Sequence, residues 1–204
     1  RTLEARALTN LGLVHGHQGR HQQAIEHHQQ ALTISRDIGY RVVEALALTS
    51  LGLVHGRQGR HPQAIEHHQQ ALVICRDIGF RTLEARALTN LGLVHGHQGR
   101  HQQAIEHHQQ ALTISRDIGG RCDEAQILNG LGEAYHANGQ PDQAHTQHTA
   151  ALTLATEIGD RYEQANAHHG LAHTHHTTGN PDQAHHHQQQ ALTLYTRLGS
   201  SSEG

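Results

Sequence analysis

The sequence predicts an all-α protein, a right-handed α-solenoid of five antiparallel helix pairs. Residues 1–39 recur without change as residues 81–119, and residues 41–79 repeat the same segment with eight substitutions. A glycine closes each period of forty residues, at Gly39, Gly79, Gly119, Gly159 and Gly199. Such a period is typical of solenoids, in which each repeat buries its apolar face against its neighbours.

Two helices are predicted in each repeat. In the first repeat, the apolar residues follow the three- and four-residue spacing of a helix in two groups. The first group is Leu3, Ala7, Leu8, Leu11 and Val14, and the second is Ala24, Ile25, Ala31, Leu32, Ile34 and Ile38. We expect the stretch from Gly16 to Gly19 to separate the helices and Gly39 to end the second one in a left-handed conformation. Pro141 and Pro181 mark later helix starts, because proline is tolerated in a first turn.

Glycines in the middle of the first helix indicate a close approach between helices. Glycine in a helix interior costs about 1 kcal/mol relative to alanine, yet four repeats carry one at the same position. We expect a second helix to pack against the bare backbone through a small alanine. The predicted pairs are Gly12 with Ala24, Gly52 with Ala64, Gly92 with Ala104, and Gly132 with Ala144.

The period also defines the predicted domain organisation. Residues 1–200 form one array with repeats 1–40, 41–80, 81–120, 121–160 and 161–200, followed by a polar tail, residues 201–204. The chain starts at Arg1, so we expect it to be a piece of a longer protein. It contains no signal peptide and no apolar run near the ~20 residues that span a bilayer. Cys75 and Cys122 lie outside any CxxC motif, which fits a reducing compartment. Together these features lead us to expect a soluble, cytoplasmic protein without a membrane partner.

Charge is distributed unevenly along the chain. Residues 1–121 hold 13 Arg and 9 acidic residues, a balance of +4, whereas residues 122–204 hold 2 Arg and 9 acidic residues, a balance of −7. The two ends are therefore weakly complementary. No basic stripe with interleaved aromatic residues is present, so nucleic acid is not expected as a partner.

A sequence motif adds a family resemblance. The segment LGLVHGHQG, followed by Ala24 and then by Ala31 and Leu32, resembles the tetratricopeptide repeat signature, and the likeness covers all five repeats. The usual repeat has about 34 residues, so the longer period is similar to the branch found in kinesin light chains, polarity adaptors and bacterial signalling proteins. The resemblance implies a protein or peptide partner in a concave groove, and a larger bacterial regulatory protein as the parent.

Histidine occupies positions where this resemblance leads us to expect bulky aromatic residues. They are His15, His55 and His95 in the first helices, and His28, His68, His108 and His148 in the second helices, whereas Tyr135 keeps an aromatic ring. The histidines either fill the aromatic positions as neutral rings or lie on a solvated face. Burial would lower the pKa of a packed ring, so stability should fall below about pH 6.5.

The resemblance also implies that first-helix side chains line the groove. They are Arg6, Thr9, Leu13, His17, Leu46, Thr49, Leu53, Arg57, Arg86, Thr89, Leu93, His97, Asn129, Glu133 and His136. Leu13, Leu53 and Leu93 would align one repeat apart, and an exposed apolar row usually indicates a partner. A peptide with apolar anchors would fit, with nearby arginines meeting its carboxylates. The alternative is that these leucines pack on the adjacent second helix.

Metal binding is a second possible role for histidine. His169, His173 and His176 lie at i, i+4 and i+7 on one predicted helix face, from which imidazoles can converge on zinc, copper or nickel. No cysteine or carboxylate completes a familiar ligand set, so adventitious Zn or Ni is expected before a physiological cofactor. No phosphate loop, nucleophile elbow or paired carboxylates occur, so no enzymatic activity is expected.

The sequence thus favours a protein-interaction module and leaves two alternatives open. One is a structural scaffold that associates with itself by head-to-tail stacking, which near-identical repeats and complementary ends would permit. The other is histidine-mediated binding of a transition metal.

Overall fold

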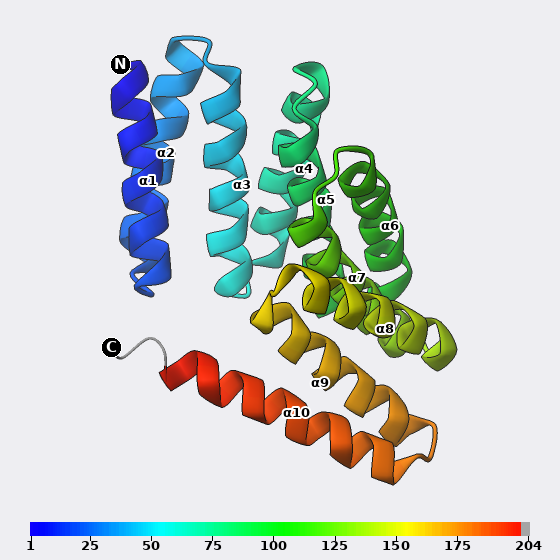
Figure 1. The fold of residues 1–204 in the computed structure, drawn as a ribbon. Helices are drawn as coiled ribbons and strands as arrows, with labels where there is room; N and C mark the ends of the chain where they lie inside the picture. The colour runs from blue at the N-terminus through cyan, green and yellow to red at the C-terminus, as the bar shows by residue number, and fades with distance from the viewer. Residues whose placement is uncertain (201–204) are drawn as a thin grey trace. The chain divides into compact units, whose positions relative to one another are not determined.

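The computed structural model describes residues 1–200, which are helical outside short turns. Their ten helices are α1 (Thr2–His17), α2 (His21–Asp37), α3 (Arg41–Arg57), α4 (His61–Asp77), α5 (Arg81–His97), α6 (His101–Asp117), α7 (Arg121–Ala137), α8 (Pro141–Ile158), α9 (Arg161–Thr177) and α10 (Pro181–Ser200). Five helix pairs follow one another along the chain, which confirms the predicted fold (Figure 1). The chain forms two compact units, Arg1–Val94 (unit 1) and His95–Gly204 (unit 2), with their boundary inside α5.

In unit 1, each helix packs against its neighbours in the sequence. α2 lies between α1 and α3, α3 packs on α4, and α1 also contacts α3 (Figure 1). Leu48 and Leu51 of α3 form a core with Ala31 and Leu32 of α2 and Ile74 of α4. The alanines let the helices approach closely, and the larger aliphatic side chains fill the space between them.

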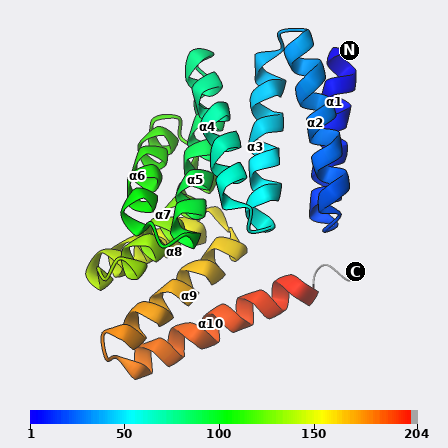
Figure 2. The ribbon, with the colours of Figure 1, turned by 180° about the vertical axis from the view of Figure 1, so that it is seen from behind.

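Unit 2 repeats this arrangement with different side chains. α7 packs on α6, α8 and α9, and α9 also packs on α8 and on α10. Figure 2 shows α9 and α10 as an antiparallel pair. Ile127, Leu128 and Leu131 of α7 and Leu171 of α9 are buried.

Glycine and proline define the helix ends largely as predicted. Gly39 has φ of 68° and follows α2 directly after Ile38, which confirms the left-handed glycine at that turn. Pro141 and Pro181 begin α8 and α10. The break in repeat 1 is shorter than expected, because α1 continues through Gly16 to His17 and only Gly19 adopts positive φ.

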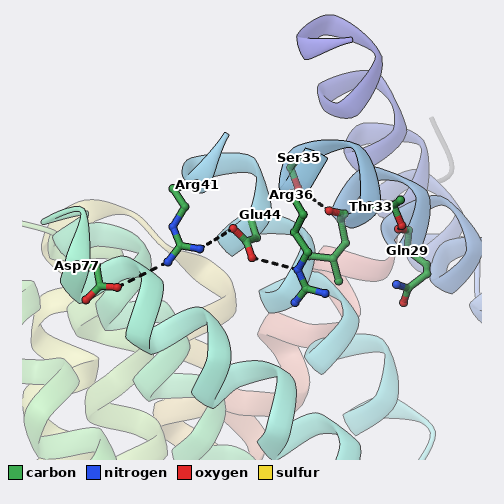
Figure 3. A network of polar contacts seen from close by, with 8 residues as sticks. Gln29, Thr33, Ser35, Arg36, Arg41, Glu44 and Asp77 are labelled. Atoms are coloured by element: carbon green, nitrogen blue, oxygen red, sulfur yellow. Dashed lines mark hydrogen bonds and ion pairs between the residues drawn. The ribbon is translucent and has the colours of Figure 1, made fainter. Parts of the chain in front are cut away.

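A buried carboxylate joins successive repeats in unit 1. Glu44 of α3 accepts a hydrogen bond from Arg36 Nε of α2 at 3.1 Å and another from Arg41 Nη1 at 2.8 Å (Figure 3). Arg41 also forms an ion pair with Asp77 of α4, at 3.6 Å. We call this contact between repeats a joint. The buried carboxylate has both of its arginine partners only when both repeats are present.

The same joint recurs one repeat later. Glu84 of α5 accepts hydrogen bonds from Arg76 Nε at 3.1 Å and from Arg81 Nη1 at 2.9 Å. In unit 2, Arg116 Nε donates to Glu124 at 2.8 Å. The ionic contact is thus a periodic element of the fold.

Gly12, Gly52 and Gly132 face histidine rings, so the predicted pairing of these glycines with alanine is wrong. A Cβ atom on Gly12 or on Gly52 would lie 2.5 Å from Cε1 of His28 or His68 respectively. Ala24 instead lies one helical turn away, where its Cβ would be 3.9 Å from a Cβ on Gly16. The helices are antiparallel, so moving one turn back on α2 corresponds to moving one turn forward on α1. Periodicity alone did not distinguish these two glycines.

The corresponding contacts in unit 2 are also with histidine. A Cβ on Gly132 would lie 2.6 Å from His148, and one on Gly130 would lie 2.8 Å from His108. Gly170 of α9 faces the ring of His148 as well, so this ring is enclosed by glycines of two successive first helices. Ala144 is buried at its own position without taking this role.

Histidines also stack in pairs at the other predicted aromatic positions. The rings of His15 and His27 have centroids 5.1 Å apart and planes 11° apart. The same stacking joins His55 to His67 and His95 to His107, at 5.3 and 5.2 Å. Imidazole therefore substitutes for the larger aromatic rings through both burial and stacking.

Burial changes the protonation of the four rings that face glycine. It lowers the pKa of His28 to about 4, that of His68 to about 3, and those of His108 and His148 to about 4, from an ordinary value of 6.5. The charge of a neighbouring histidine lowers these pKa values further, as that of His27 does for His28. The buried rings are therefore neutral at pH 7.

The glycine contact predicts opposite effects for two alanine substitutions in α3. Gly52→Ala should destabilise the protein by about 1–2 kcal/mol, because the overpacking penalty exceeds the gain in helix propensity. Gly56→Ala should be neutral or stabilising by up to about 1 kcal/mol, because its nearest atoms, at 3.7 and 3.9 Å, leave room for a methyl group. Urea unfolding of both variants would measure the difference. Equal stability of the two would contradict the close contact with His68.

The neutral rings predict that stability is lost in acid. An unfolded histidine binds a proton near pH 6.5 while a buried one does not, so stability is complete above pH 6.5 and declines down to the folded pKa values near 4. At pH 5, each of the four rings should cost about 2 kcal/mol, a total comparable with the stability of a whole domain. Thermal melting followed by circular dichroism from pH 7.5 to 4.5 would show this decline. A flat profile would mean that the rings are solvated.

Candidate functional site

The predicted groove residues differ in exposure. Those on the surface are Arg6, Leu13, His17, Arg57, Arg86, His97 and Glu133, and those partly buried are Leu46, Leu53, Leu93 and His136. Thr9, Thr49, Thr89 and Asn129 are buried. The structure therefore leaves most of the predicted surface accessible but removes one position from each of the first four repeats.

The buried threonines pair their hydroxyl groups within their own helices. Thr9 Oγ1 donates to the carbonyl of Ala5 at 2.9 Å, and Thr49 and Thr89 make the same bond with Ala45 and Ala85. The carbonyl one turn earlier satisfies the hydroxyl, so threonine can border the packed face without an unpaired polar atom. These side chains cannot contact a ligand as the structure stands.

A small cavity in unit 1 brings four predicted residues together. Leu13 and His17 of α1 and Leu53 and Arg57 of α3 line it, with the buried His28 behind them. Its volume of about 20 Å³ is enough for one water molecule. Arg57 Nη1 lies 3.4 Å from the carbonyl of Gly16 and donates to it near the end of α1, where a cation is favourable. The cavity is thus an apolar notch with a cationic border.

The leucine row is only partly exposed. Leu13 shows 39% of its surface, whereas Leu53 and Leu93 are more buried. Each leucine therefore buries part of its side chain and retains some accessible surface.

In unit 2, the predicted groove and metal residues lie near one another. The rings of His136 and His173 meet edge to face with centroids 5.3 Å apart, and those of His169 and His173 are 5.7 Å apart. Burial and then the charge of Glu163 raise the pKa of the Glu133 carboxyl. This surface carries imidazoles and carboxyl groups, in contrast to the leucines and arginines of unit 1.

The metal hypothesis gains no geometric support. Across residues 1–200, no three His, Cys, Asp or Glu side chains come together in a way that could hold a metal ion. His169, His173 and His176 share a helix but do not form such a group. His173 and His176 instead line a pocket between α9 and α10, together with His185.

A buried polar network in unit 2 was not predicted. His148 Nδ1 donates to Asn129 Oδ1 at 3.3 Å, and Asn129 Nδ2 donates to the Glu163 carboxylate at 2.8 Å and to its carbonyl at 3.1 Å. Asn166 also donates to this carboxylate, at 3.2 Å, and Tyr195 donates to Asn166 Oδ1 at 2.6 Å. The change from threonine to asparagine at this position of repeat 4 was the available signal.

The first three repeats leave the corresponding ring nitrogens unpaired. Among the described residues, Nδ1 of His28, His68 and His108 has no hydrogen-bond partner. Buried polar atoms are usually paired. Asn129 provides this pairing for His148, whereas the counterparts of His148 in the first three repeats lack it. It acts as an interior link of the fold and is not part of the accessible surface.

Comparison with known families gives a consistent result. The family model of the tetratricopeptide repeat matches four overlapping segments that together span nearly the whole chain: residues 3–77, 43–117, 83–157 and 123–197. No curated protein matches it. Within the described residues, no helix has the length and apolar character needed to cross a membrane.

Several solved structures share the fold at low sequence identity. BtubC (BKLC) from P. vanneervenii has 18% identity and a TM-score of 0.81, over 94% of this chain and 80% of that one. A putative kinesin light chain from Podosopora anserina with nearly identical TPR-like repeats has 17% identity and a TM-score of 0.76, over 97% and 98%. A Rap protein complexed with Competence and Sporulation Factor has 17% identity and a TM-score of 0.83, over 95% and 54%.

The buried network predicts that Asn129→Thr destabilises the protein. Threonine is present at this position in the first three repeats but cannot replace the amide that serves both His148 and Glu163, so about 1–3 kcal/mol should be lost. Gln126→Thr, an exposed change on the same helix, is the matched control and should be nearly neutral. Chemical denaturation of both variants would measure this. Equal stability of Asn129→Thr and the native chain would show that the network contributes nothing.

Proposed function

The chain belongs to the tetratricopeptide repeat family, and we propose that it is an interaction scaffold whose unit 1 binds an acidic peptide segment with apolar anchors. The observation that carries this proposal is the notch between α1 and α3, where Leu13 and Leu53 lie beside His17 and Arg57. The notch is small in the free protein, so an aliphatic side chain would dock on its leucine border and would not enter deeply.

The charge around the notch favours an acidic ligand. Arg57 lines the notch and is exposed. Arg6 is exposed elsewhere on α1, and Arg86 occupies the position of α5 that matches Arg6. Arginine binds carboxylates with two parallel hydrogen bonds, which gives direction as well as affinity. A segment with aliphatic residues flanked by Asp or Glu therefore matches the chemistry of this surface.

The family and fold support binding as the role. A structure of similar fold contains a Rap protein complexed with Competence and Sporulation Factor, so this fold is compatible with a bound partner. The described groove residues include no arrangement typical of catalysis, and we propose no enzymatic role. A larger bacterial regulatory protein in the cytoplasm is the proposed parent, on the family resemblance of the sequence alone.

The proposal predicts which peptides the chain selects. Panning a random peptide library over the protein, with EDTA present to remove metal effects, should enrich sequences that combine aliphatic and acidic residues. Leu53→Glu should weaken their binding at least tenfold, which corresponds to about 1.4 kcal/mol. Arg57→Glu should weaken binding and reduce its dependence on salt. Fluorescence anisotropy of an enriched peptide would measure both effects.

The matched control for this test is Val73→Glu. Val73 is 58% exposed on α4, so this variant makes the same kind of apolar-to-acidic change outside the notch. It should bind the peptide as the native protein does. Enrichment of unrelated sequences, or equal losses in Leu53→Glu and Val73→Glu, would contradict the proposed binding surface.

A further inference from the structure

Two helices of identical sequence have different environments in unit 1. Residues 2–14 of α1 and 82–94 of α5 carry the same side chains. Leu3, Leu11 and Val14 are 78%, 47% and 50% exposed, whereas their counterparts Leu83, Leu91 and Val94 are 2%, 1% and 5% exposed. The sequence is the same, so the difference measures what the neighbouring helices cover. α1 presents an apolar face that is buried when another repeat precedes it.

The contacts of α5 show what kind of surface covers this face. Leu83 belongs to a core cluster with Ala71, Ile74 and Cys75 of the preceding α4. Val94 Cγ2 would lie 3.7 Å from a Cβ on Gly56 of α3. Val94 therefore fills a depression in the preceding helix pair, where Gly56 lies beside the buried Ala64.

The last helix pair offers the corresponding depression without a side chain to fill it. His176 and Ala184 occupy the positions that Gly56 and Ala64 hold in repeat 2. They line a pocket of about 490 Å³ between α9 and α10, with Ala172 and Gln188. Leu192 of α10 is 64% exposed, whereas Leu72, its counterpart on α4, is 8% exposed.

We propose that the apolar face of α1 docks onto the α9–α10 pair of a second copy of this chain. Val14 would enter the pocket beside Ala184, and Leu11 and Leu3 would pack along α10 near Leu192. The contact would reproduce between molecules the packing that joins consecutive repeats within one molecule. The face and the pocket are different surfaces, so each bound copy leaves one of each free, and the assembly grows head to tail.

Charge favours this pairing over contact between two α1 faces. The part of the chain that contains α1, residues 1–121, carries a formal balance of +4, and the part that contains α9 and α10, residues 122–204, carries −7. Opposite charges assist the encounter of the α1 end of one chain with the α9–α10 end of another. Like charges oppose the pairing of two α1 ends or of two α9–α10 ends.

The tail surface differs from the packing surface of α3 and α4 at Tyr195 as well as at His176. Tyr195 replaces the small Cys75 of α4, and its hydroxyl donates to Asn166 at 2.6 Å. The larger ring narrows the space for an incoming helix. The association is therefore weaker than the packing of covalently linked repeats, and it should be reversible and dependent on concentration.

The test uses the full chain and three single substitutions. Light scattering or sedimentation over about a hundredfold range of concentration should show the native mass rising from the 22.4 kDa of one chain to multiples of it. Val14→Glu and Leu192→Glu should each remain monomeric. Val73→Glu, the exposed control on α4, should grow as the native chain does. Circular dichroism would verify that each variant is folded.

Mixing the two interface variants gives the most specific result. Val14→Glu keeps an intact tail and Leu192→Glu keeps an intact head, so an equimolar mixture should form a complex of two chains and grow no further. High salt should weaken this complex by reducing the attraction between the ends.

Three outcomes would overturn the proposal. A native chain that is monomeric at every concentration would leave the α1 face to a different occupant, such as a further repeat of a longer protein. Growth that persists in both Val14→Glu and Leu192→Glu would place the contact elsewhere. Loss of association only in Val14→Glu, without complementation in the mixture, would indicate a symmetric contact between two α1 faces.

Discussion

The contact between a buried imidazole and a bare glycine backbone determines how the helices of this protein pack. His28 and His68 occupy the space that a side chain on Gly12 or Gly52 would need. The imidazole ring is planar and smaller than the ring of tyrosine or tryptophan. Even so, it fits only against a position of the first helix that has no Cβ atom. Glycine sets the position of the second helix, and the ring in turn excludes water from the joint. The neutral state of the histidine follows from the same contact, because a ring enclosed in this way cannot keep a charge solvated.

The sequence was sufficient to predict the helix pairs but not how each helix is rotated about its axis. The forty-residue period, Gly39 and the two prolines gave the correct order and most of the ends, because these signals act locally. Gly12 was paired with the wrong residue, because Gly12 and Gly16 lie one turn apart on the same face and periodicity treats them alike. Choosing between them requires the size of the side chain opposite, which is a property of the packed structure.

The candidate site shows the same limit. Leu13, His17, Leu53 and Arg57 lie near one another, because equal positions of adjacent repeats become neighbours. Thr9 and Asn129 were expected on the surface and are buried, because they lie at the border of the packed stripe, where a small rotation decides exposure. The difference between α1 and α5 could not be obtained from sequence, since residues 2–14 and 82–94 are identical and only their neighbours differ.

The periodic ion pairs also affect how such a chain can change in length. Glu44 is held by Arg36 and Arg41, and Glu84 is held by Arg76 and Arg81, through the same atoms at nearly the same distances. Deleting or inserting one forty-residue segment by recombination would therefore rejoin compatible surfaces and leave no buried carboxylate without its arginines. Near-identical repeats also make such recombination more frequent. The number of repeats can thus vary in evolution without any new interface having to arise.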